Sequence, residues 1–533
     1  MQFDMIVVGA GSAGCALASR LSEDGRYSVA LLEAGPKDLN PWIHIPVGYF
    51  RTMGNPRSDW QYVTEEDPGI AGRAIKWPRG RVLGGSSSIN GLLYVRGQPQ
   101  DYNTWAQMGC RGWSWDDVAP IFKRAETWKG PNGSEYRGTK GPLSVQTSRL
   151  SREIVDHWVD AAVAAGYKRT EDYNGLDQEG VGYFQLTMAG GKRCSSAVAY
   201  LHPNRSRKNL TVITNAQTEK VIIEGGRAMG VRARVNGKLV DIHAHHEVIL
   251  SAGAIGSPQI LMLSGVGDGN ELRRHGIHVK SNVKGVGKNL QDHLQARPIF
   301  KTNLSTINVE TNNLLKQAGI ALRYALTGKG PMTMAASLGT GFLKTEEHME
   351  TPDIQFHIQP FSADNAVDGP HKFSAFTASV LQLRPESAGH LELASNKMDD
   401  HPKIHPNYLA TDTDCRTIVK GIKVARKIAE FEPLKSHVTE EYAPGHGVSK
   451  VDDTAILDWA RRTSVTIYHP TGTCKMGIDP MAVVDPRLKV KGVRGLRVAD
   501  ASIMPQIVSG NTNAPCIMIG EKASDLILED MRH

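Results

Sequence analysis

The chain has 533 residues, of which 40% are hydrophobic, so it can bury a large core and form two or more domains. Its 62 basic and 55 acidic residues give a net charge of +7, but no run of about five like charges occurs, which argues against a nucleic-acid partner. No stretch of about eighteen apolar residues occurs either, and the chain enters an apolar strand almost at once. We therefore expect neither a transmembrane helix nor a removable signal peptide.

Cysteine and histidine positions bear on compartment and metal binding. Two histidine clusters, at residues 243–246 and 401–405, lie in an alternating strand pattern and in a proline-punctuated loop, without companion ligands nearby. We therefore predict no metal site. Six cysteines are far apart and include no C-x-x-C pair: Cys15, Cys110, Cys194, Cys415, Cys474 and Cys516. They predict free thiols and a cytoplasmic location, with a periplasmic chain that has lost its leader as the alternative.

The first forty residues carry the strongest pattern. An apolar run, Met5–Val8, predicts a buried parallel strand, and Gly9, Gly11 and Gly14 follow it in G-x-G-x-x-G spacing. In this fingerprint the first glycine makes the tight turn, the second lets backbone approach a pyrophosphate, and the third packs helix on strand. The helix expected over Cys15–Leu21 would direct its N-terminus at that pyrophosphate.

A second strand expected over Tyr27–Leu32 ends in Glu33. The number of residues between the glycine fingerprint and Glu33 is the spacing expected for a carboxylate that binds a ribose hydroxyl pair. The negative charge of Glu33 argues against a 2′-phosphate. The N-terminal region therefore predicts binding of an ADP moiety, belonging to either NAD or FAD.

Two glycine-rich regions follow. Residues 34–78 are rich in Gly, Pro, Asn and Trp, and their length predicts an ordered excursion over the bound cofactor. Residues 80–97 contain paired glycines and then Ser86, Ser87 and Ser88, which predict a helix N-terminus whose free amides are capped by serine hydroxyls. A capped structural loop without a ligand is the alternative.

Near the C-terminus, His469 lies in a Gly- and Pro-rich loop at residues 468–477. Taken alone, it favours a histidine satisfied within the fold over a catalytic one. Asp292 and His293 are neighbours in another loop, where we expect them to fix that loop by hydrogen bonds.

The motifs together resemble a known family. Residues 80–97 resemble the first signature of the glucose–methanol–choline (GMC) family of flavin oxidoreductases, and residues 253–267 resemble the second. The N-terminal fingerprint and the blocks at 468–477, 495–502 and 509–515 also match, so the resemblance covers essentially the whole chain. It implies FAD instead of NAD. Some members tether FAD through a histidine at the position that Ile89 occupies, so it implies non-covalent FAD here.

The resemblance also implies roles for individual residues. His469 would be the catalytic base, and Asn511, with Asn513 as the neighbouring candidate, would face the flavin. For Asp500 and Val221 the alternatives are capping of the turn before Ser502 and filling of a strand. The cofactor-binding positions implied are Gly9, Gly11, Ser12, Ala13, Gly14, Glu33, Ala34, Arg81, Val82, Gly85, Asn90, Gly91, Val221, Ala252, Tyr468, Asp500, Ala501, Asn511 and Thr512.

The chemistry accounts for the two catalytic residue types. Oxidation of an alcohol removes a hydroxyl proton and a hydride from the same carbon. A histidine with a pKa near its usual value of about 6.5 can accept that proton near neutral pH, and Asn511 would donate to the forming alkoxide. The resemblance also implies that the final helix, expected from Asn513, directs its positive end at the flavin.

The expected fold class is α/β (α+β), with a Rossmann-like FAD-binding domain joined to a substrate-binding domain built on an antiparallel sheet covered by helices. We predict the first domain at residues 1–150, 203–297 and 463–533, and the second at 151–202 and 298–462.

Specific elements are expected within these domains. Strands at 353–359, 373–383 and 390–393 would form the second sheet, with helices such as 312–326 and 411–431 over it. Strands at 209–215, 217–223, 230–235 and 240–250 would return to the nucleotide domain. Another helix is expected over 257–264, with Pro258 in its first turn.

The predicted function is FAD-dependent oxidation of a small alcohol, with electrons passed to a quinone-like acceptor, as in the choline- and sorbose-dehydrogenase branch. An O₂-dependent oxidase of the same family is the first alternative, and a lyase or photodecarboxylase on the same fold is the second. Peripheral association with a membrane is compatible with a quinone acceptor.

Overall fold

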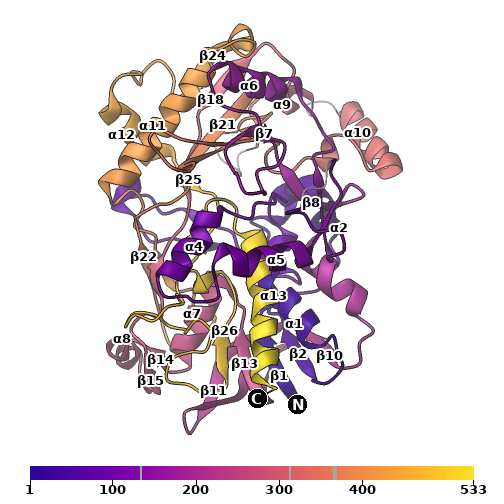
Figure 1. Ribbon diagram of the computed structural model, residues 1–533, viewed down its shortest axis with the longest axis vertical. Coiled ribbons are helices and arrows are strands. Elements are labelled where there is room, and N and C mark those ends of the chain that lie inside the picture. The colour runs from indigo at the N-terminus through magenta and orange to yellow at the C-terminus, as the bar shows by residue number, and fades with distance from the viewer. Residues whose placement is uncertain (132–134, 311–313, 364–368, 533) are drawn as a thin grey trace.

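The computed structural model describes residues 1–131, 135–310, 314–363 and 369–532. It is elongated, with one large sheet and both chain termini in its lower half and a second large sheet in its upper half (Figure 1). The mixed α/β architecture confirms the predicted fold class. Within the described residues no helix combines the length and hydropathy that crossing a membrane requires.

The lower sheet is built on parallel strands. Its order is β10 (Leu210–Ile213), β2 (Val29–Leu32), β1 (Gln2–Val8), β13 (Lys238–Leu250), β12 (Arg227–Val235) and β11 (Ala216–Glu224), with β26 (Leu496–Val498) beside β13. Neighbouring strands are parallel except for β11, β12 and the first part of β13, which form an antiparallel meander. Val8 lies opposite both Leu32 and Leu250. The residues after these three strands, including Gly9 and Glu33, therefore meet at one edge of the sheet.

Helices from the two ends of the chain pack together on the lower sheet. α1 (Ser12–Leu21) lies against α13 (Asn513–Asp530), which also contacts α5 (Trp115–Ala125) (Figure 1). The two helices come so close that a Cβ atom at Gly520 would lie 2.3 Å from the carbonyl oxygen of Ala13. This packing places the beginning of α13 beside the glycine fingerprint.

Helix α7 (Gly253–Leu263) corrects one expectation. It begins at Gly253, so Pro258 lies inside the helix and not in its first turn. A proline there cannot donate to the carbonyl four residues earlier. That carbonyl, of Ala254, accepts a hydrogen bond of 2.6 Å from the hydroxyl of Thr473, which satisfies it and ties α7 to the loop containing His469.

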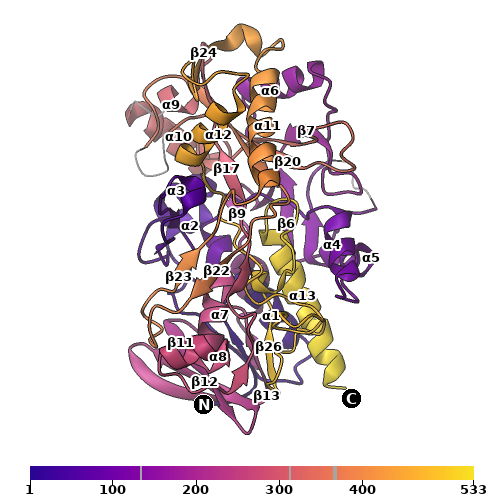
Figure 2. The same ribbon diagram turned by 90° about the vertical axis from the view of Figure 1, so that its left-hand side faces the viewer.

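The upper sheet is antiparallel, as predicted. Its main order is β24 (Val438–Ala443), β18 (Ile299–Thr302), β21 (Ala375–Gln382), β20 (Ile354–Gln359), β19 (Gly339–Leu343) and β7 (Gly180–Tyr183), with β17 (Leu294–Ala296) beside β21 and β25 (Val465–Thr466) beside β17. The covering helices include α6 (Glu153–Ala164), α11 (Asp412–Ile428) and α12 (Asp453–Thr463) (Figure 2). The domain boundaries stay a prediction.

Two expected elements of this half need comment. The strand expected at 390–393 is β22 (Gly389–Glu392), but it forms a separate sheet with β16 (Lys288–Leu290) and β23 (Lys403–His405). The chain leaves the upper sheet after β21 through Pro385, which has no N–H to donate to a ladder. The helix expected at 312–326 is found as α10 (Leu314–Thr327), and residues 312 and 313 lie outside the described residues.

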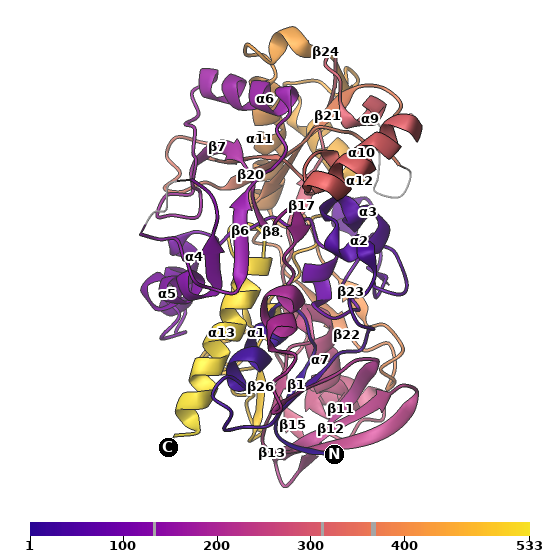
Figure 3. The ribbon, with the colours of Figure 1, turned by 90° about the vertical axis from the view of Figure 1, so that its right-hand side faces the viewer.

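The remaining elements are short or lie around these sheets. Residues 34–78 are ordered, as expected, and contain α2 (Pro41–His44), α3 (Tyr49–Thr52), β3 (Tyr62–Val63) and β4 (Lys76–Trp77). Figure 3 shows α2 and α3 beside α10. The others are α4 (Pro99–Gln107), β5 (Glu126–Trp128), β6 (Leu143–Thr147), β8 (Gln185–Ala189), β9 (Lys192–Arg193), β14 (Val266–Gly267), α8 (Gly269–Arg274), β15 (Ser281–Asn282) and α9 (Ile307–Glu310).

Candidate active site

The three fingerprint glycines have different surroundings. A Cβ atom on Gly9, whose φ is +100°, would lie 2.5 Å from the carbonyl oxygen of Ser251, and one on Gly14 would lie 1.9 Å from that of Gly9. A Cβ on Gly11 would meet nothing closer than 4.0 Å. The turn and the helix packing thus require the first and third glycines, whereas the second leaves space next to the backbone. This arrangement fits a bound pyrophosphate.

Glu33 is buried at the end of β2, level with Gly9. Its carboxylate accepts hydrogen bonds from the backbone N–H groups of Ala10, at 3.0 Å, and Gly35, at 2.8 Å. Burial raises its pKa to about 7, although these bonds and the charge of Arg81 oppose the rise. Because a carboxylate has about four acceptor sites, two backbone bonds leave capacity for the hydroxyls of a ribose.

The serine run behaves differently from the expectation. Residues Gly85–Ser88 form one turn of 3₁₀ helix without a side-chain cap, and the N–H groups of Gly85 and Ser87 donate to the carbonyls of Val82 and Gly84. The hydroxyl of Ser87 donates to the carbonyl of Gly84 and that of Ser88 to the carbonyl of Leu83, at 2.6 and 2.7 Å. The serines therefore fix the turn through its carbonyls and do not cap free helix amides.

Arg193 is a site residue that the sequence analysis missed. It is 2% exposed, and its guanidinium donates to the side-chain oxygen of Asn90 at 2.6 Å and to the backbone carbonyls of Ser87 and Ile43. Burial lowers its pKa to about 9. Arg193 thus fixes the oxygen of Asn90 and leaves the amide hydrogens of Asn90 for another acceptor. A single arginine beside a turn has no sequence pattern that would have identified it.

Other predicted cofactor-binding residues are engaged within the protein. The Asp500 carboxylate accepts from Gly253 and Ser257 with one oxygen and from the backbone and hydroxyl of Ser502 with the other. It therefore caps the turn before Ser502, which was the alternative, and its contact with a cofactor stays a prediction. The backbone N–H of Val221 donates to the Ser264 hydroxyl at 2.8 Å.

The implied residues around the fingerprint lie at helix starts and turns. Gly85 packs on Gly11, since a Cβ on Gly85 would lie 2.6 Å from the Cα of Gly11. Arg81 has a buried Nε without a partner among the described residues. Ala252 precedes α7, Ala501 begins a 3₁₀ turn, Thr512 precedes α13, and Val82 is buried with Ile89. The cofactor contacts of these residues, and of Ser12, Ala13, Ala34, Gly91 and Tyr468, stay predictions.

The structure separates the two candidate asparagines. Ser12 donates its hydroxyl to the side-chain oxygen of Asn513 at 2.8 Å, which joins the starts of α1 and α13. Asn511 instead lies beside His469, with 3.1 Å between its Nδ2 and Nε2 of the imidazole. Asn511 is therefore the one placed to act together with His469.

Strand pairing brings His469 to His293, although 176 residues separate them in the chain. Leu294 of β17 lies opposite Thr466 of β25, and the N–H of Ile467 donates to the carbonyl of His293 at 3.0 Å. His293 just before one strand and His469 just after the other are thus held side by side.

The loop around His469 is strained and tightly held. Tyr468 has a φ of +69°, a conformation that costs a bulky residue on the order of 1–3 kcal/mol. The guanidinium of Arg79 donates to the carbonyl of Tyr468 at 2.6 Å, and the N–H of Tyr468 donates to the hydroxyl of Thr466 at 2.7 Å. Asp292 accepts the N–H of His469 at 2.7 Å. We expected Asp292 and His293 to fix their own loop by hydrogen bonds; the bonds that they make instead hold the loop of His469.

A chain of hydrogen bonds determines which nitrogen of His469 is free of a proton. The carbonyl of Leu383 can only accept, so Nε2 of His293, 2.9 Å away, must donate. In a neutral ring Nδ1 of His293 then accepts, and its partner at 3.0 Å is Nδ1 of His469. His469 therefore carries its proton on Nδ1 and presents the lone pair of Nε2 toward Asn511.

Burial keeps both imidazoles neutral. It lowers the pKa of His293 to about 4, and it lowers the pKa of His469 well below its usual value, with further contributions from the neighbouring His293, His357 and Arg79. The ordinary value assumed from the sequence was therefore too high. A buried neutral imidazole with an unprotonated Nε2, next to an amide donor, can accept a proton from a substrate hydroxyl.

Comparison with known proteins shows the family to which the chain belongs. The GMC oxidoreductase family models match residues 3–295, for the N-terminal part, and residues 385–520, for the C-terminal part. The chain belongs to the GMC oxidoreductase family. The GMC resemblance inferred from the motifs is thus confirmed.

The similarity to named relatives extends over 99% of the chain. The chain is 43% identical to the mitochondrial choline dehydrogenase of Homo sapiens, covering 99% of this chain and 90% of that protein. It is 42% identical to the alcohol dehydrogenase [acceptor] of Pseudomonas putida, covering 99% and 96%. Among solved structures it resembles pyridoxine 4-oxidase from Mesorbium loti, with a TM-score of 0.89, 30% identity and 99% of each chain covered. It also resembles the formate oxidase of Aspergillus oryzae, with a TM-score of 0.92, 26% identity and 100% and 99% covered.

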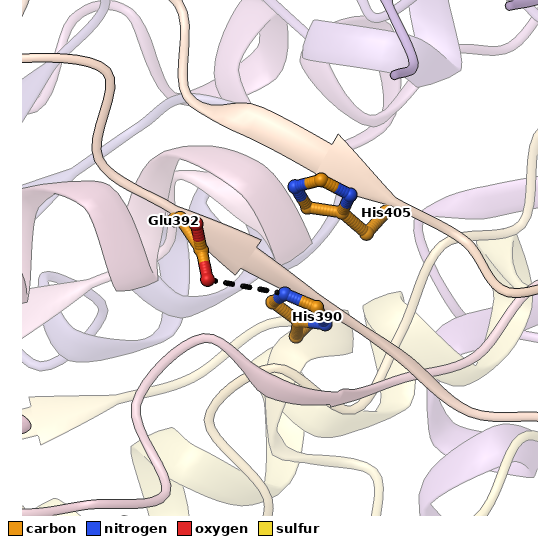
Figure 4. A group of neighbouring side chains, drawn as sticks. All are labelled: His390, Glu392 and His405. Atoms are coloured by element: carbon orange, nitrogen blue, oxygen red, sulfur yellow. Dashed lines mark ion pairs between the residues drawn. The ribbon is translucent and has the colours of Figure 1, made fainter. Parts of the chain in front are cut away.

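One further cluster in this GMC oxidoreductase corrects a statement made from the sequence. His405 does have companions: His390 and Glu392 bring three potential metal ligands within 4.8 Å of one another (Figure 4). The two imidazoles stack across adjacent strands, with planes 14° apart, and Nε2 of His390 lies 3.3 Å from the Glu392 carboxylate. Parallel rings do not direct their lone pairs at one point, and Lys288 lies opposite His390 in the ladder. We interpret the group as a cross-strand stack beside an ion pair.

Proposed function

We propose that the protein binds FAD non-covalently and oxidises an alcohol, with His469 as general base and Asn511 as the donor to the developing alkoxide. The observation that carries this proposal is the neutral His469, whose tautomer is fixed by His293 and whose Nε2 faces Asn511. Membership of the GMC oxidoreductase family, and a solved neighbour described as a formate oxidase with modified FAD, support the cofactor.

The residues present fit FAD. The open side of Gly11 and the start of α1 suit a pyrophosphate, and the buried Glu33 suits a ribose. Ile89 has no group that could form a covalent link to a flavin, which supports non-covalent attachment. FAD, when bound, supplies the acceptor for the hydride that leaves the substrate carbon.

The protein residues would handle the proton and the negative charge. A substrate hydroxyl in contact with both His469 and Asn511 would give its proton to Nε2 of His469 while its oxygen accepts from Nδ2 of Asn511. The imidazolium so formed still donates from Nδ1 to His293. Because it is buried and lies near the charge of Arg79, this cation would readily lose its proton again.

Replacement of His469 tests the proposal. General-base assistance typically contributes about a hundred- to ten-thousandfold to a rate. His469→Ala should therefore slow the reduction of FAD by an alcohol in the dark by about that factor. The purified variant should keep its yellow FAD. A variant that reduces FAD as fast as the wild type would contradict the proposal, and so would a wild-type protein that cannot be reconstituted with FAD. Because reduction in the dark by an alcohol is not expected of a lyase or photodecarboxylase, the same assay separates these activities.

We propose a quinone-like compound as the electron acceptor, with O₂ as the alternative. The relatives support both, since one is named alcohol dehydrogenase [acceptor] and another oxygen-dependent choline dehydrogenase. Enzyme reduced anaerobically by substrate should be reoxidised faster by a soluble quinone than by air-saturated buffer. The opposite order would identify an oxidase. A panel of alcohols that includes choline, assayed with a dye acceptor, defines the substrate.

We propose a cytoplasmic enzyme that associates with the membrane periphery. Helix α10 lies at the side of the upper half, and Leu322 and Leu326 on it are 62% and 76% exposed (Figure 3). Residues 314–327 include two basic and no acidic residues. This composition favours an anionic lipid surface. Sedimentation with anionic vesicles measures this association. Leu322→Asp should weaken binding to the vesicles without changing the activity on a soluble alcohol.

A further inference from the structure

Gln355 extends the hydrogen-bond chain beyond Asn511. It lies on β20 with its side chain fully buried, and its Nε2 donates to Oδ1 of Asn511 at 3.3 Å. Its own Oε1 has no hydrogen-bond partner among the described residues. Gln355 is thus the end of a series of groups that begins at the carbonyl of Leu383.

Every direction in this series follows from its starting point. With His469 protonated on Nδ1, its Nε2 can only accept, so the atom of Asn511 at 3.1 Å must be the amide nitrogen. The other end of the Asn511 amide is then an oxygen, which requires a donor. Gln355 supplies that donor with its NH₂ group. The two amides therefore cannot be reversed without placing two acceptors or two donors against each other.

We propose that Gln355 is a positioning residue for the oxidation, acting through Asn511. It holds the amide nitrogen of Asn511 toward the place where the substrate oxygen gains negative charge, and it holds the amide oxygen away from that place. This inference rests on the proposed function, because it assumes that a substrate oxygen contacts both His469 and Asn511.

Gln359 provides a matched comparison. It lies four residues further along β20, on the same face of the strand, but its Nε2 donates to the hydroxyl of Ser337 at 3.5 Å and not to Asn511. A change at Gln359 alters the polarity of this face without breaking the chain that leads to His469.

A double-mutant cycle tests the proposal. Gln355→Leu should lower kcat by on the order of tenfold to a hundredfold with little change in KM, since the affected contact strengthens as the alkoxide forms. In an Asn511→Ala background the same replacement should have no further effect on kcat. Gln359→Leu should leave kcat near the wild-type value in both backgrounds. An equal loss from Gln355→Leu in both backgrounds would overturn the proposal, and so would no loss in either.

The pH profile gives a second readout, which a purely structural role would not change. A carboxylate at position 355 cannot donate to Asn511, so Gln355→Glu should turn the Asn511 amide round and place its oxygen against Nε2 of His469. That oxygen favours a proton on Nε2, and the acid limb of kcat/KM should move to higher pH. The other charged or titratable groups facing His469 are His293, His357 and Arg79, with Asp292 at its backbone N–H, and none of these is changed.

The Asn511→Ala background separates this effect from charge acting through space. If the shift in the acid limb caused by Gln355→Glu disappears in that background, Asn511 transmits it. If the same shift persists, or if Gln355→Glu causes none, the proposal is wrong. His469→Ala, measured in parallel, tests the proposed function itself. If that variant is as fast as the wild type, His469 is not the base, whatever the Gln355 variants show.

Discussion

Replacement of His293 tests whether a hydrogen bond fixes the tautomer of the base. His293→Leu removes the acceptor of the His469 Nδ1–H group at a fully buried position. Leaving a buried donor without a partner costs about 1–3 kcal/mol. The ring can avoid this cost by moving its proton to Nε2, but it then no longer has the lone pair that accepts the substrate proton.

The size of the effect follows from this cost. At about 1.4 kcal/mol per factor of ten, the population of the active tautomer, and with it the rate of anaerobic reduction by alcohol, should fall about 5- to 150-fold. His293→Gln is the matched control. Its amide can accept from His469 with the oxygen and donate to Leu383 with the nitrogen, so it should keep a rate within about tenfold of the wild type.

Stopped-flow absorbance of the FAD-loaded enzyme measures both rates, and retained FAD absorbance together with the midpoint of thermal unfolding shows whether the variants are folded. If FAD in His293→Leu is reduced as fast as in the wild type, the hydrogen bond from His293 does not fix the tautomer of His469. The same conclusion follows if His293→Gln is folded but as slow as His293→Leu, because burial or side-chain volume would then matter and not the hydrogen bond.

Three further predictions concern stability and cofactor binding. Glu126 is buried between Arg96 and Arg137, so Glu126→Gln leaves guanidinium charge uncompensated. This change should lower the free energy of unfolding, measured in urea, by about 3–5 kcal/mol. The exposed pair Lys450–Glu430 should contribute less than about 1 kcal/mol. Burial lowers the pKa of His357 to about 3, so the unfolded chain binds a proton there below about pH 6.5 that the folded chain does not. His357 therefore contributes stability above pH 6.5 that is lost as the pH falls, by about 2 kcal/mol at pH 5, and the free energy of unfolding of His357→Gln should fall less between pH 7 and pH 5 than that of the wild type. Arg193→Met should release Asn90 and raise the dissociation constant of FAD at pH 7 by on the order of tenfold, as measured by fluorescence on titration of the apoprotein.

Local patterns predicted the nucleotide-binding half well. The parallel strands are short apolar runs, and the turn between β1 and α1 requires glycine at Gly9 and Gly14 whatever the rest of the chain does. The position of Glu33 follows from the length of a single βαβ unit. These features depend on residues close in sequence, so sequence periodicity could identify them.

The catalytic arrangement depends on long-range contacts that periodicity does not encode. β17 and β25 have three and two residues, too few for an alternating pattern, yet their pairing joins His293 to His469. Gln355 is one of three polar residues that alternate with apolar ones in β20, and this pattern gives no sign of its partner 156 residues away. Family resemblance supplied His469 and Asn511, but it could not supply the direction of the bonds between them.

The low pKa of His469 has a consequence for how the two catalytic residues share the work. A base that stays unprotonated at neutral pH because it is buried, with the guanidinium of Arg79 nearby, is also a weak base, and it accepts a proton with less driving force than an exposed histidine. An alkoxide in the same position is favoured by the charge of Arg79 and by a correctly oriented Asn511 amide. The site therefore gains less from a strong base than from stabilising the anion that the base leaves behind, so the orientation of Asn511 is as important for the rate as the tautomer of His469. Both are set by the same carbonyl group, that of Leu383, through a single series of hydrogen bonds.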